Sequence, residues 1–216
     1  VLDLTQGPAA ADWLVDASMN IAESCFTSAA DCCAIIEGRP DGSIRKFTYA
    51  ELRALSNRVA RGLLAHGIKQ REAVAVFLPM TAESVAIYLG IVLAGCTVVS
   101  IADSFSADEV RSRLTIGRAT AVFTVMSAQR GDKQIPVYPR VVEADGPMAI
   151  IVERAGATVA QSSQLLRDTD IAWPQLLSDD ASDIVVNGPP DTAMNILFSS
   201  GTTGTPKAII WDHSTP

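Results

Sequence analysis

The sequence predicts an α/β fold in which a parallel β-sheet is flanked by helices. Three apolar runs, at residues 73–78, 96–101 and 120–125, have the length and composition of strands. Helical segments at 82–94 and 106–117 separate them, and this alternation is typical of a parallel sheet with crossover connections. Because each run is continuously apolar, we expect both faces of the sheet to be covered.

A helix is expected before the first of these strands, from 49 to 66. Thr48 and Glu51 form a capping-box pattern at its start, and Gly67 has the chemistry of a left-handed C-cap. His66 is therefore expected in the last turn, where it complements the helix dipole, rather than as a catalytic base.

The stretch from 84 to 102 carries no charge and approaches the roughly 20 residues needed to cross a bilayer. Gly90 and Gly95 interrupt it, and its flanks are Glu83 and Asp103, with no lysine or arginine beside them. We therefore expect a helix followed by a strand, and no membrane span.

The part from 127 to 190 has the weakest pattern. Short strands are expected at 140–143 and 148–152, and a helix over 161–167. The acidic, proline-containing stretch 178–192 indicates a linker to the last strands.

The first 46 residues form a lead-in segment. Its apolar side chains are expected to pack on the domain that follows; they are Trp13, Leu14, Met19, Ile21 and Phe26.

The composition is that of a globular protein, with 48% hydrophobic and 19% charged residues among 216. A net charge of −7 argues against a nucleic-acid partner, because no basic stripe replaces counterions along a phosphate backbone. A phosphate ligand remains compatible, since one lysine and a set of amides bind it locally.

Cysteine and histidine are sparse. The four cysteines form no CxxC pair, and His66 and His213 are the two histidines, so we expect no metal site. Cys32 and Cys33 lie in an apolar run and are expected to be buried thiols of a reducing compartment. Few histidines and no GxSxG motif argue against a hydrolase.

The most informative segment is 195–207, NILFSSGTTGTPK, which places serine, threonine and glycine between an apolar strand and a lysine. Its glycines allow close backbone approach to a ligand, its hydroxyls and amides donate to anionic oxygens, and Lys207 adds a compact positive charge. Ile209, Ile210 and Trp211 follow, so a strand–loop–strand arrangement is expected. The segment matches neither the Walker loop nor the dinucleotide fingerprint.

The segment resembles the phosphate-binding signature of the adenylate-forming superfamily, which includes acyl-CoA synthetases, luciferases and peptide-synthetase adenylation domains. The matching residues are Ser199, Ser200, Gly201, Thr202, Thr203, Gly204, Thr205, Pro206 and Lys207. Ala208 departs from the glycine usual in the family, and His213 falls at its histidine position. The run 13–26 resembles the lead-in of the acetyl-CoA-synthetase-like branch.

The resemblance implies an acid–thiol ligase that activates a carboxylic acid with ATP and Mg²⁺ and passes the acyl group to coenzyme A. It implies phosphate binding by the residues from Ser199 to Thr205 and by Lys207, with Lys207 in a catalytic role. It also divides the chain into a lead-in, 1–46, and the amino-terminal part of an AMP-dependent synthetase/ligase domain, 47–216. In the family the adenine pocket, the acyl pocket, the magnesium-binding acid and a second catalytic lysine lie further along the chain, so we expect this chain to be an amino-terminal lobe, inactive alone.

Two other interpretations stay open. A peptide-synthetase adenylation domain would pass its acyl group to a carrier-protein thiol, and a truncated, non-catalytic protein would bind a nucleotide or a partner. The resemblance of the lead-in suggests a cytoplasmic or peroxisomal acyl-activating enzyme.

Overall fold

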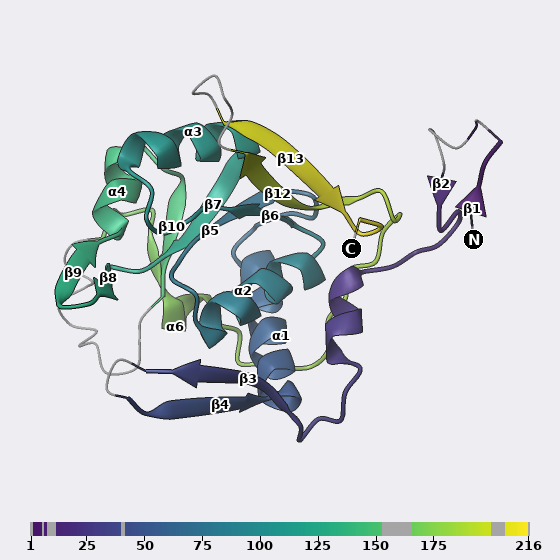
Figure 1. Cartoon of the computed structure of the whole chain (residues 1–216), viewed down its shortest axis with the longest axis horizontal. Helices are drawn as coiled ribbons and strands as arrows, with labels where there is room; N and C mark the ends of the chain where they lie inside the picture. Colours follow the sequence, from purple (N-terminus) through teal and green to yellow (C-terminus); the bar gives the residue numbers. More distant parts are fainter. Residues whose placement is uncertain are drawn as a thin grey trace.

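The computed structural model describes residues 2–5, 7, 12–39, 42–152, 166–199 and 206–215. Within them, a seven-stranded sheet has the order β11-β10-β7-β5-β6-β12-β13 (Figure 1). Its neighbouring strands are parallel, except that β13 pairs antiparallel with β12. The strands are β5 (Ala73–Phe77), β6 (Thr97–Ser100), β7 (Ala119–Thr124), β10 (Met148–Ile151), β11 (Ile171–Ala172), β12 (Ala193–Ser199) and β13 (Lys207–Asp212).

The three strands expected from the apolar runs are confirmed as neighbours. β5 lies between β6 and β7, and Ala75 pairs with Val99 on one side and Val122 on the other. All three of these side chains are fully buried. This burial explains why the runs are apolar throughout instead of alternating.

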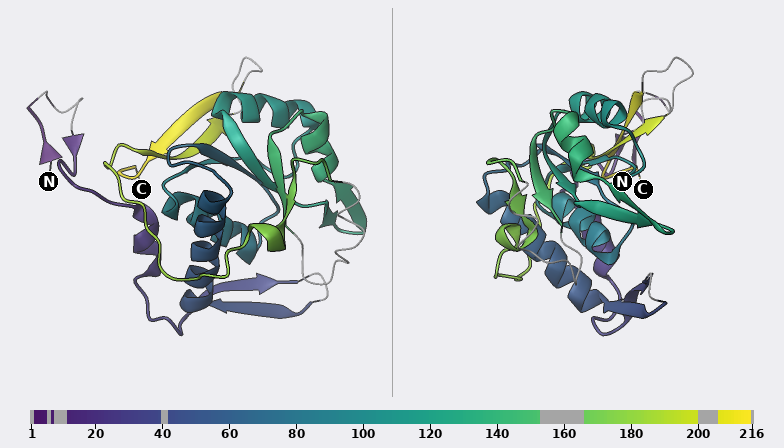
Figure 2. Two further views of the ribbon diagram at one scale, coloured as in Figure 1. Left: turned by 180° about the vertical axis from the view of Figure 1, so that it is seen from behind. Right: turned by 90° about the vertical axis from the view of Figure 1, so that its left-hand side faces the viewer.

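Helices cover both faces of this sheet. α1 (Tyr49–Ala65) and α2 (Ala82–Leu93) pack together on one face, and α3 (Ala107–Gly117) and α4 (Tyr138–Glu143) cover the other (Figure 2). The capping box expected at Thr48 is present, with reciprocal bonds to Glu51. His66 is the C-cap residue of α1, and its Nδ1 lies 2.9 Å from the Gly62 carbonyl oxygen, as expected for a structural role at the helix end.

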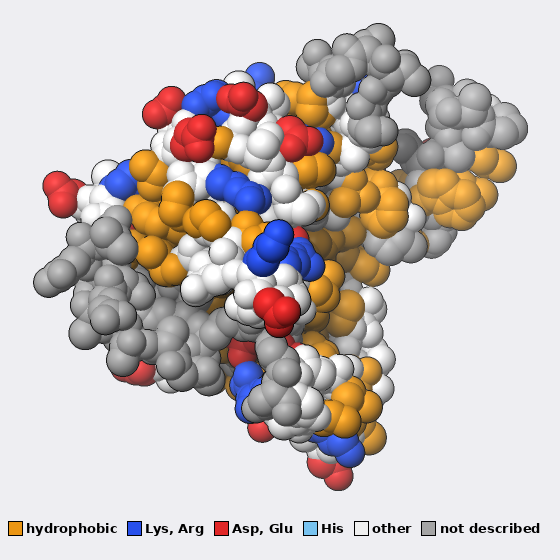
Figure 3. Space-filling model, turned by 60° about the vertical axis from the view of Figure 1, so that its left-hand side comes forward, with side chains coloured by type: hydrophobic (Ala, Val, Ile, Leu, Met, Phe, Trp, Pro, Cys, Tyr) orange, Lys and Arg blue, Asp and Glu red, His pale blue; other side chains and the backbone are white. Residues whose placement is uncertain are grey.

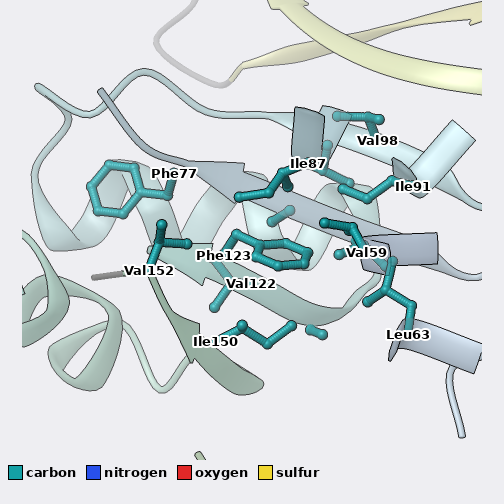
Figure 4. Close-up of a cluster of buried hydrophobic side chains, with 14 of the residues drawn as sticks. Val59, Leu63, Phe77, Ile87, Ile91, Val98, Val122, Phe123, Ile150 and Val152 are labelled. Atoms are coloured by element: carbon teal, nitrogen blue, oxygen red, sulfur yellow. The ribbon is translucent and has the colours of Figure 1, made fainter. Parts of the chain in front are cut away.

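The core lies between α1, α2 and the central strands (Figure 4). Phe77 and Phe123 are fully buried, and Phe123 meets Trp173 of the short helix α6 (Trp173–Leu176) edge to face. Ile87 and Ile91 of α2 are buried on the same face of the sheet as Phe123 (Figure 4). The central strands and α2 are therefore held in a dry, closely packed layer.

Gly90 lies inside α2 (Ala82–Leu93), within the helix expected at 82–94. A Cβ at this position would approach the Ser56 carbonyl oxygen to 2.7 Å, so the glycine allows α1 and α2 to cross closely. Gly95, with φ +71°, does follow the helix end. Stretch 84–102 is thus a helix and a strand, and no helix within the described residues is both long and apolar enough to cross a membrane.

The weakly patterned region brings one correction. Residues 140–143 form part of helix α4, not a strand, because Pro139 in the first turn is well placed to start a helix. The strand expected at 148–152 is confirmed as β10. Of the helix expected at 161–167, residues 161–165 lie outside the described part, and 166–167 are not helical.

The stretch 178–192 is irregular, as expected for a linker, and α1 holds part of it. Arg53 donates to both carboxylate oxygens of Asp183, at 2.7 and 2.8 Å, and Asn57 donates to the same carboxylate at 2.9 Å.

The lead-in contains a small hairpin, β1 (Leu2–Asp3) with β2 (Asp12–Trp13), that lies away from the main body (Figure 1). Trp13 is 61% exposed and Leu14 is exposed, so the prediction that they pack on the domain is wrong. Ile21 and Phe26, at the two ends of the 3₁₀ helix η2 (Ile21–Phe26), do pack against the core. Their burial follows from the docking of η2 on α2.

Two further hairpins lie outside the central sheet: β3 (Cys33–Gly38) with β4 (Ile44–Thr48), and β8 (Ser127–Arg130) with β9 (Lys133–Pro136). Cys32 and Cys33 stand at the start of the first hairpin and are exposed, which contradicts their expected burial. The hairpin buries a residue further along it, Phe47, while the two cysteines lie at its exposed start. Cys96 is buried, and burial raises the pKa of its thiol to about 12.

The side of the molecule that carries α4, β8 and β9 shows acidic and basic side chains in small separate groups, with hydrophobic side chains between them (Figure 3).

Candidate functional site

The expected strand–loop–strand arrangement is confirmed by β12 and β13. Ser199 and Lys207 are directly opposite each other at the end of this hairpin where residues 200–206 connect the two strands. Lys207 is exposed and Ser199 is partly buried. The other predicted phosphate-binding residues lie outside the described part; they are Ser200, Gly201, Thr202, Thr203, Gly204 and Thr205. The structure therefore brings together the two ends of the segment.

This connected end of the hairpin lies at the carboxyl edge of the parallel sheet. β12 runs parallel to β6, so Ser199 ends its strand on the same edge as Ser100. From this edge the chain turns to α2 on one face after β5, and to α3 on the other face after β6. Such a reversal between neighbouring strands of an open parallel sheet leaves a crevice in which ligands bind.

A crevice of about 450 Å³ is present at this point, between the ends of β5 and β6 and helix α2. Its walls are largely apolar, and Tyr88, Ser100 and Asp103 add polar groups. Burial raises the pKa of the Tyr88 phenol, and a hydrogen bond with Asn195 opposes the rise. Asn195 also accepts a hydrogen bond of 2.9 Å from Ser100 Oγ, so β12 is tied to this wall.

The alternation of side chains along β12 and β13 shows which face of the sheet Lys207, the predicted catalytic lysine, lies on. Asn195 and Ser199 are an even number of residues apart and share one face of β12, the face toward α2. Lys207 is paired with Ser199 and shares that face. Phe198 points to the other face, where Arg113 of α3 lies over its ring.

His213 has a structural position. It is 4% exposed, and its Nδ1 accepts a 3.1 Å hydrogen bond from the backbone amide of Ile21. Burial lowers the pKa of His213, against the effect of the neighbouring Asp212 carboxylate. His213 therefore joins the end of β13 to η2 as a neutral imidazole.

Sequence reasoning missed Tyr88, Asn195, Asp103 and Arg113. For two of them the sequence position could have indicated a place in the site. Asp103 comes just after the end of a predicted strand, and Asn195 is the first residue of the segment that carries the glycines. No group of three or more histidine, cysteine or acidic side chains that could hold a metal ion occurs in the described ranges.

The whole of this region matches a known family model. Residues 25–215 match the model described as AMP-binding enzyme. The chain belongs to the AMP-binding enzyme family. The match includes the hairpin, the crevice and the segment 199–207 that resembles the family's phosphate-binding signature.

Individual relatives of this AMP-binding chain are acyl-activating enzymes and acyl-CoA synthetases. It is 42% identical to probable acyl-activating enzyme 17, peroxisomal, of Arabidopsis thaliana over 94% of its length and 30% of the relative's. It is 40% identical to hexanoyl-CoA synthase of Cannabis sativa, covering 99% of itself and 31% of that protein. Acetyl-coenzyme A synthetase of Ralstonia nicotianae is 32% identical over the whole chain and 34% of its own length. The chain thus spans about a third of the length of these relatives.

The fold is shared with solved structures of the same kind. Acetoacetyl-CoA synthetase from Streptomyces lividans superposes with a TM-score of 0.83 at 27% identity, over 94% of this chain and 32% of that one. The mostly parallel sheet flanked by helices is therefore the fold of the amino-terminal domain of acyl-CoA synthetases.

Proposed function

We propose that this AMP-binding chain is part of a carboxylate–CoA ligase, which converts a carboxylic acid and ATP to an acyl adenylate and pyrophosphate and then transfers the acyl group to coenzyme A. The observation that carries the proposal is the segment 199–207, with its ends paired at the carboxyl edge of a parallel sheet. The similarity to acyl-activating and acyl-CoA-forming relatives supports it.

In this proposal Lys207 offsets negative charge that develops on the departing pyrophosphate, and its exposed position at the mouth of the hairpin leaves it accessible to a nucleotide. Ser199, Ser200, Gly201, Thr202, Thr203, Gly204 and Thr205 supply hydroxyl and amide donors to the phosphate oxygens. These roles are assigned from the sequence motif. The division into a lead-in, 1–46, and a catalytic-domain part, 47–216, rests on the resemblance of the run 13–26 to the lead-in of acetyl-CoA-synthetase-like members.

Magnesium would supply charge neutralisation to the ATP phosphates in such a reaction. The described residues contain no cluster of three or more metal-ligating side chains, so this part of the chain does not fit a protein-held magnesium site.

The names of the relatives favour coenzyme A as acyl acceptor over a carrier-protein thiol, because three of them form or use acyl-CoA. They also favour a catalytic protein over a purely nucleotide-binding one. For location we propose a cytoplasmic or peroxisomal protein, since one relative is described as peroxisomal.

The test uses the enzyme produced from the complete reading frame that contains this chain. Lys207→Ala should slow carboxylate-dependent exchange of pyrophosphate into ATP by about 10²- to 10³-fold, or roughly 3 to 4 kcal/mol, because it removes a charge placed against the leaving group. Lys46→Ala, which removes an exposed lysine of β4, is the matched control and should leave the exchange rate unchanged. Equal exchange rates for Lys207→Ala and the wild type would remove the segment from the chemistry.

A further inference from the structure

A second cavity lies on the face of the hairpin opposite Lys207. It has a volume of about 430 Å³ and opens between α3 and the ends of β12 and β13. Its lining residues are Phe105, Asp108, Glu109, Ser112, Arg113, Phe198 and Pro206. One of these lining residues, Arg113, is a buried cation.

Arg113 is only 5% exposed, yet it has little to bond to. A guanidinium carries five N–H donors. Among the described residues its one hydrogen bond runs from Nη1 to the Glu109 carbonyl oxygen, at 2.9 Å, and its Nε is buried with no partner. No ion pair joins Arg113 to a described carboxylate. Buried charges are normally paired, so these donors point to an acceptor that binds from outside.

The two carboxylates on the cavity wall are already engaged. Glu109 accepts bonds from the backbone amide and the hydroxyl of Ser106, each at 2.9 Å, and Asp108 pairs with Arg111 at 2.7 Å. Glu109 still feels the charge of Arg113, which contributes to lowering the pKa of that carboxyl after the Ser106 bonds. Neither carboxylate accepts a hydrogen bond from the Arg113 nitrogens.

Two aromatic rings hold the guanidinium. Its central carbon lies 3.8 Å from the Phe105 ring centroid and 5.6 Å from that of Phe198. Stacking uses the flat faces of a guanidinium and leaves its in-plane N–H groups free. Arg113 thus lines the cavity with a guanidinium held by two rings, and the fork of its N–H groups matches two oxygens of a phosphate.

We propose that Arg113 binds a phosphate group in this cavity. The anion accepts charge-assisted hydrogen bonds from the unpaired N–H groups of Arg113, and the rings of Phe105 and Phe198 limit access of water to them. Two sources of the phosphate follow from the proposed function, on which this choice rests: ATP and coenzyme A. The experiment separates them.

Calorimetric titrations of the 216-residue chain with ATP and with coenzyme A, at low salt, test the site. Arg113→Met keeps the side-chain stem without donors and should weaken binding of one of the two nucleotides at least tenfold; Arg113→Lys, which keeps the charge without the fork, should weaken it less. Arg111→Met is the matched control, because Arg111 lies on the same helix, is 42% exposed and is not one of the residues that line the cavity. It should bind both nucleotides as the wild type does.

A measurement on the wild type does not depend on how the variants fold. With ¹⁵N-labelled arginine, the Nε–H signal of Arg113, assigned from Arg113→Lys, should shift on addition of the bound nucleotide and stay in place on addition of adenosine.

An Arg113 Nε–H signal that neither nucleotide moves, or equal affinities of Arg113→Met and the wild type for both, would overturn the phosphate site. Weakened binding in Lys207→Ala with unchanged binding in Arg113→Met would overturn this inference alone and leave the proposed function standing. Equal weakening by Arg111→Met would show non-specific charge attraction and would also overturn it.

Discussion

Gly90 offers a direct test of how the two helices that support the crevice are held together. In Gly90→Ala the new Cβ would lie 2.7 Å from the Ser56 carbonyl oxygen and 2.7 Å from Val59 Cβ. Both residues belong to α1 and are fully buried, and a valine in a helix is confined almost to one rotamer, so neither neighbour moves without moving the helix. Overpacking of this kind costs roughly 1 to 3 kcal/mol, while replacing glycine by alanine inside a helix returns about 1 kcal/mol.

Because both contacts fall well below normal separation and one is to backbone, the cost should lie at the upper end of that range. We expect Gly90→Ala to lower the free energy of unfolding by about 2 kcal/mol. Pulse proteolysis across a urea series measures it at concentrations low enough to avoid association. Gly38→Ala, whose Cβ would meet nothing within 4 Å, is the control and should change stability by less than about 0.5 kcal/mol. A Gly90→Ala protein as stable as the wild type would refute the close crossing of α1 and α2.

Two further outcomes are expected. Nδ1 of His213 must be unprotonated to accept the hydrogen bond from the Ile21 amide, and burial lowers the pKa of His213 in the folded chain below its ordinary value of about 6.5. The unfolded chain therefore binds the proton more tightly than the folded chain does. The free energy of unfolding consequently falls as the pH drops below about 6.5. The urea midpoint should therefore fall more between pH 7.5 and pH 5.5 in the wild type than in His213→Gln, and parallel pH profiles would contradict this role. The isolated chain of residues 1–216 should form no acyl adenylate, because a phosphate-binding segment alone has too few contacts to orient ATP. Hydroxylamine trapping with short, medium and aromatic acids checks this, and magnesium-dependent hydroxamate formation with turnover would show a complete active site.

The parts of the fold that sequence reasoning found are those with local causes. The strands β5, β6 and β7 are continuous apolar runs because helices cover both faces of the sheet, and a run of that kind is visible without knowledge of its neighbours. The start of α1 was equally accessible, since the capping box joins Thr48 to a residue only three positions away.

The errors arose where the pattern was short or the environment was distant. Val141 and Val142 favour a strand by propensity, but they follow Pro139 and form a helix of six residues that packs on α3. Cys32 and Cys33 are small and apolar, yet they lie at the exposed start of a two-stranded hairpin. The close approach of Gly90 to α1 could not be predicted, because its neighbours Ser56 and Val59 lie far earlier in the chain.

The candidate site shows the same division between local and distant causes. The segment 199–207 could be recognised because its hydroxyls, glycines and lysine are consecutive. The surroundings of Arg113 could not, because Phe198 comes from the end of β12, and the pairing of β12 with β6 brings it to α3 beside Phe105. That pairing also puts Lys207 and Arg113 on opposite faces of one hairpin. A nucleotide phosphate drawn to Lys207 and one drawn to Arg113 would therefore occupy different places, and comparison of the two variants with ATP and with coenzyme A can assign each place to its own ligand.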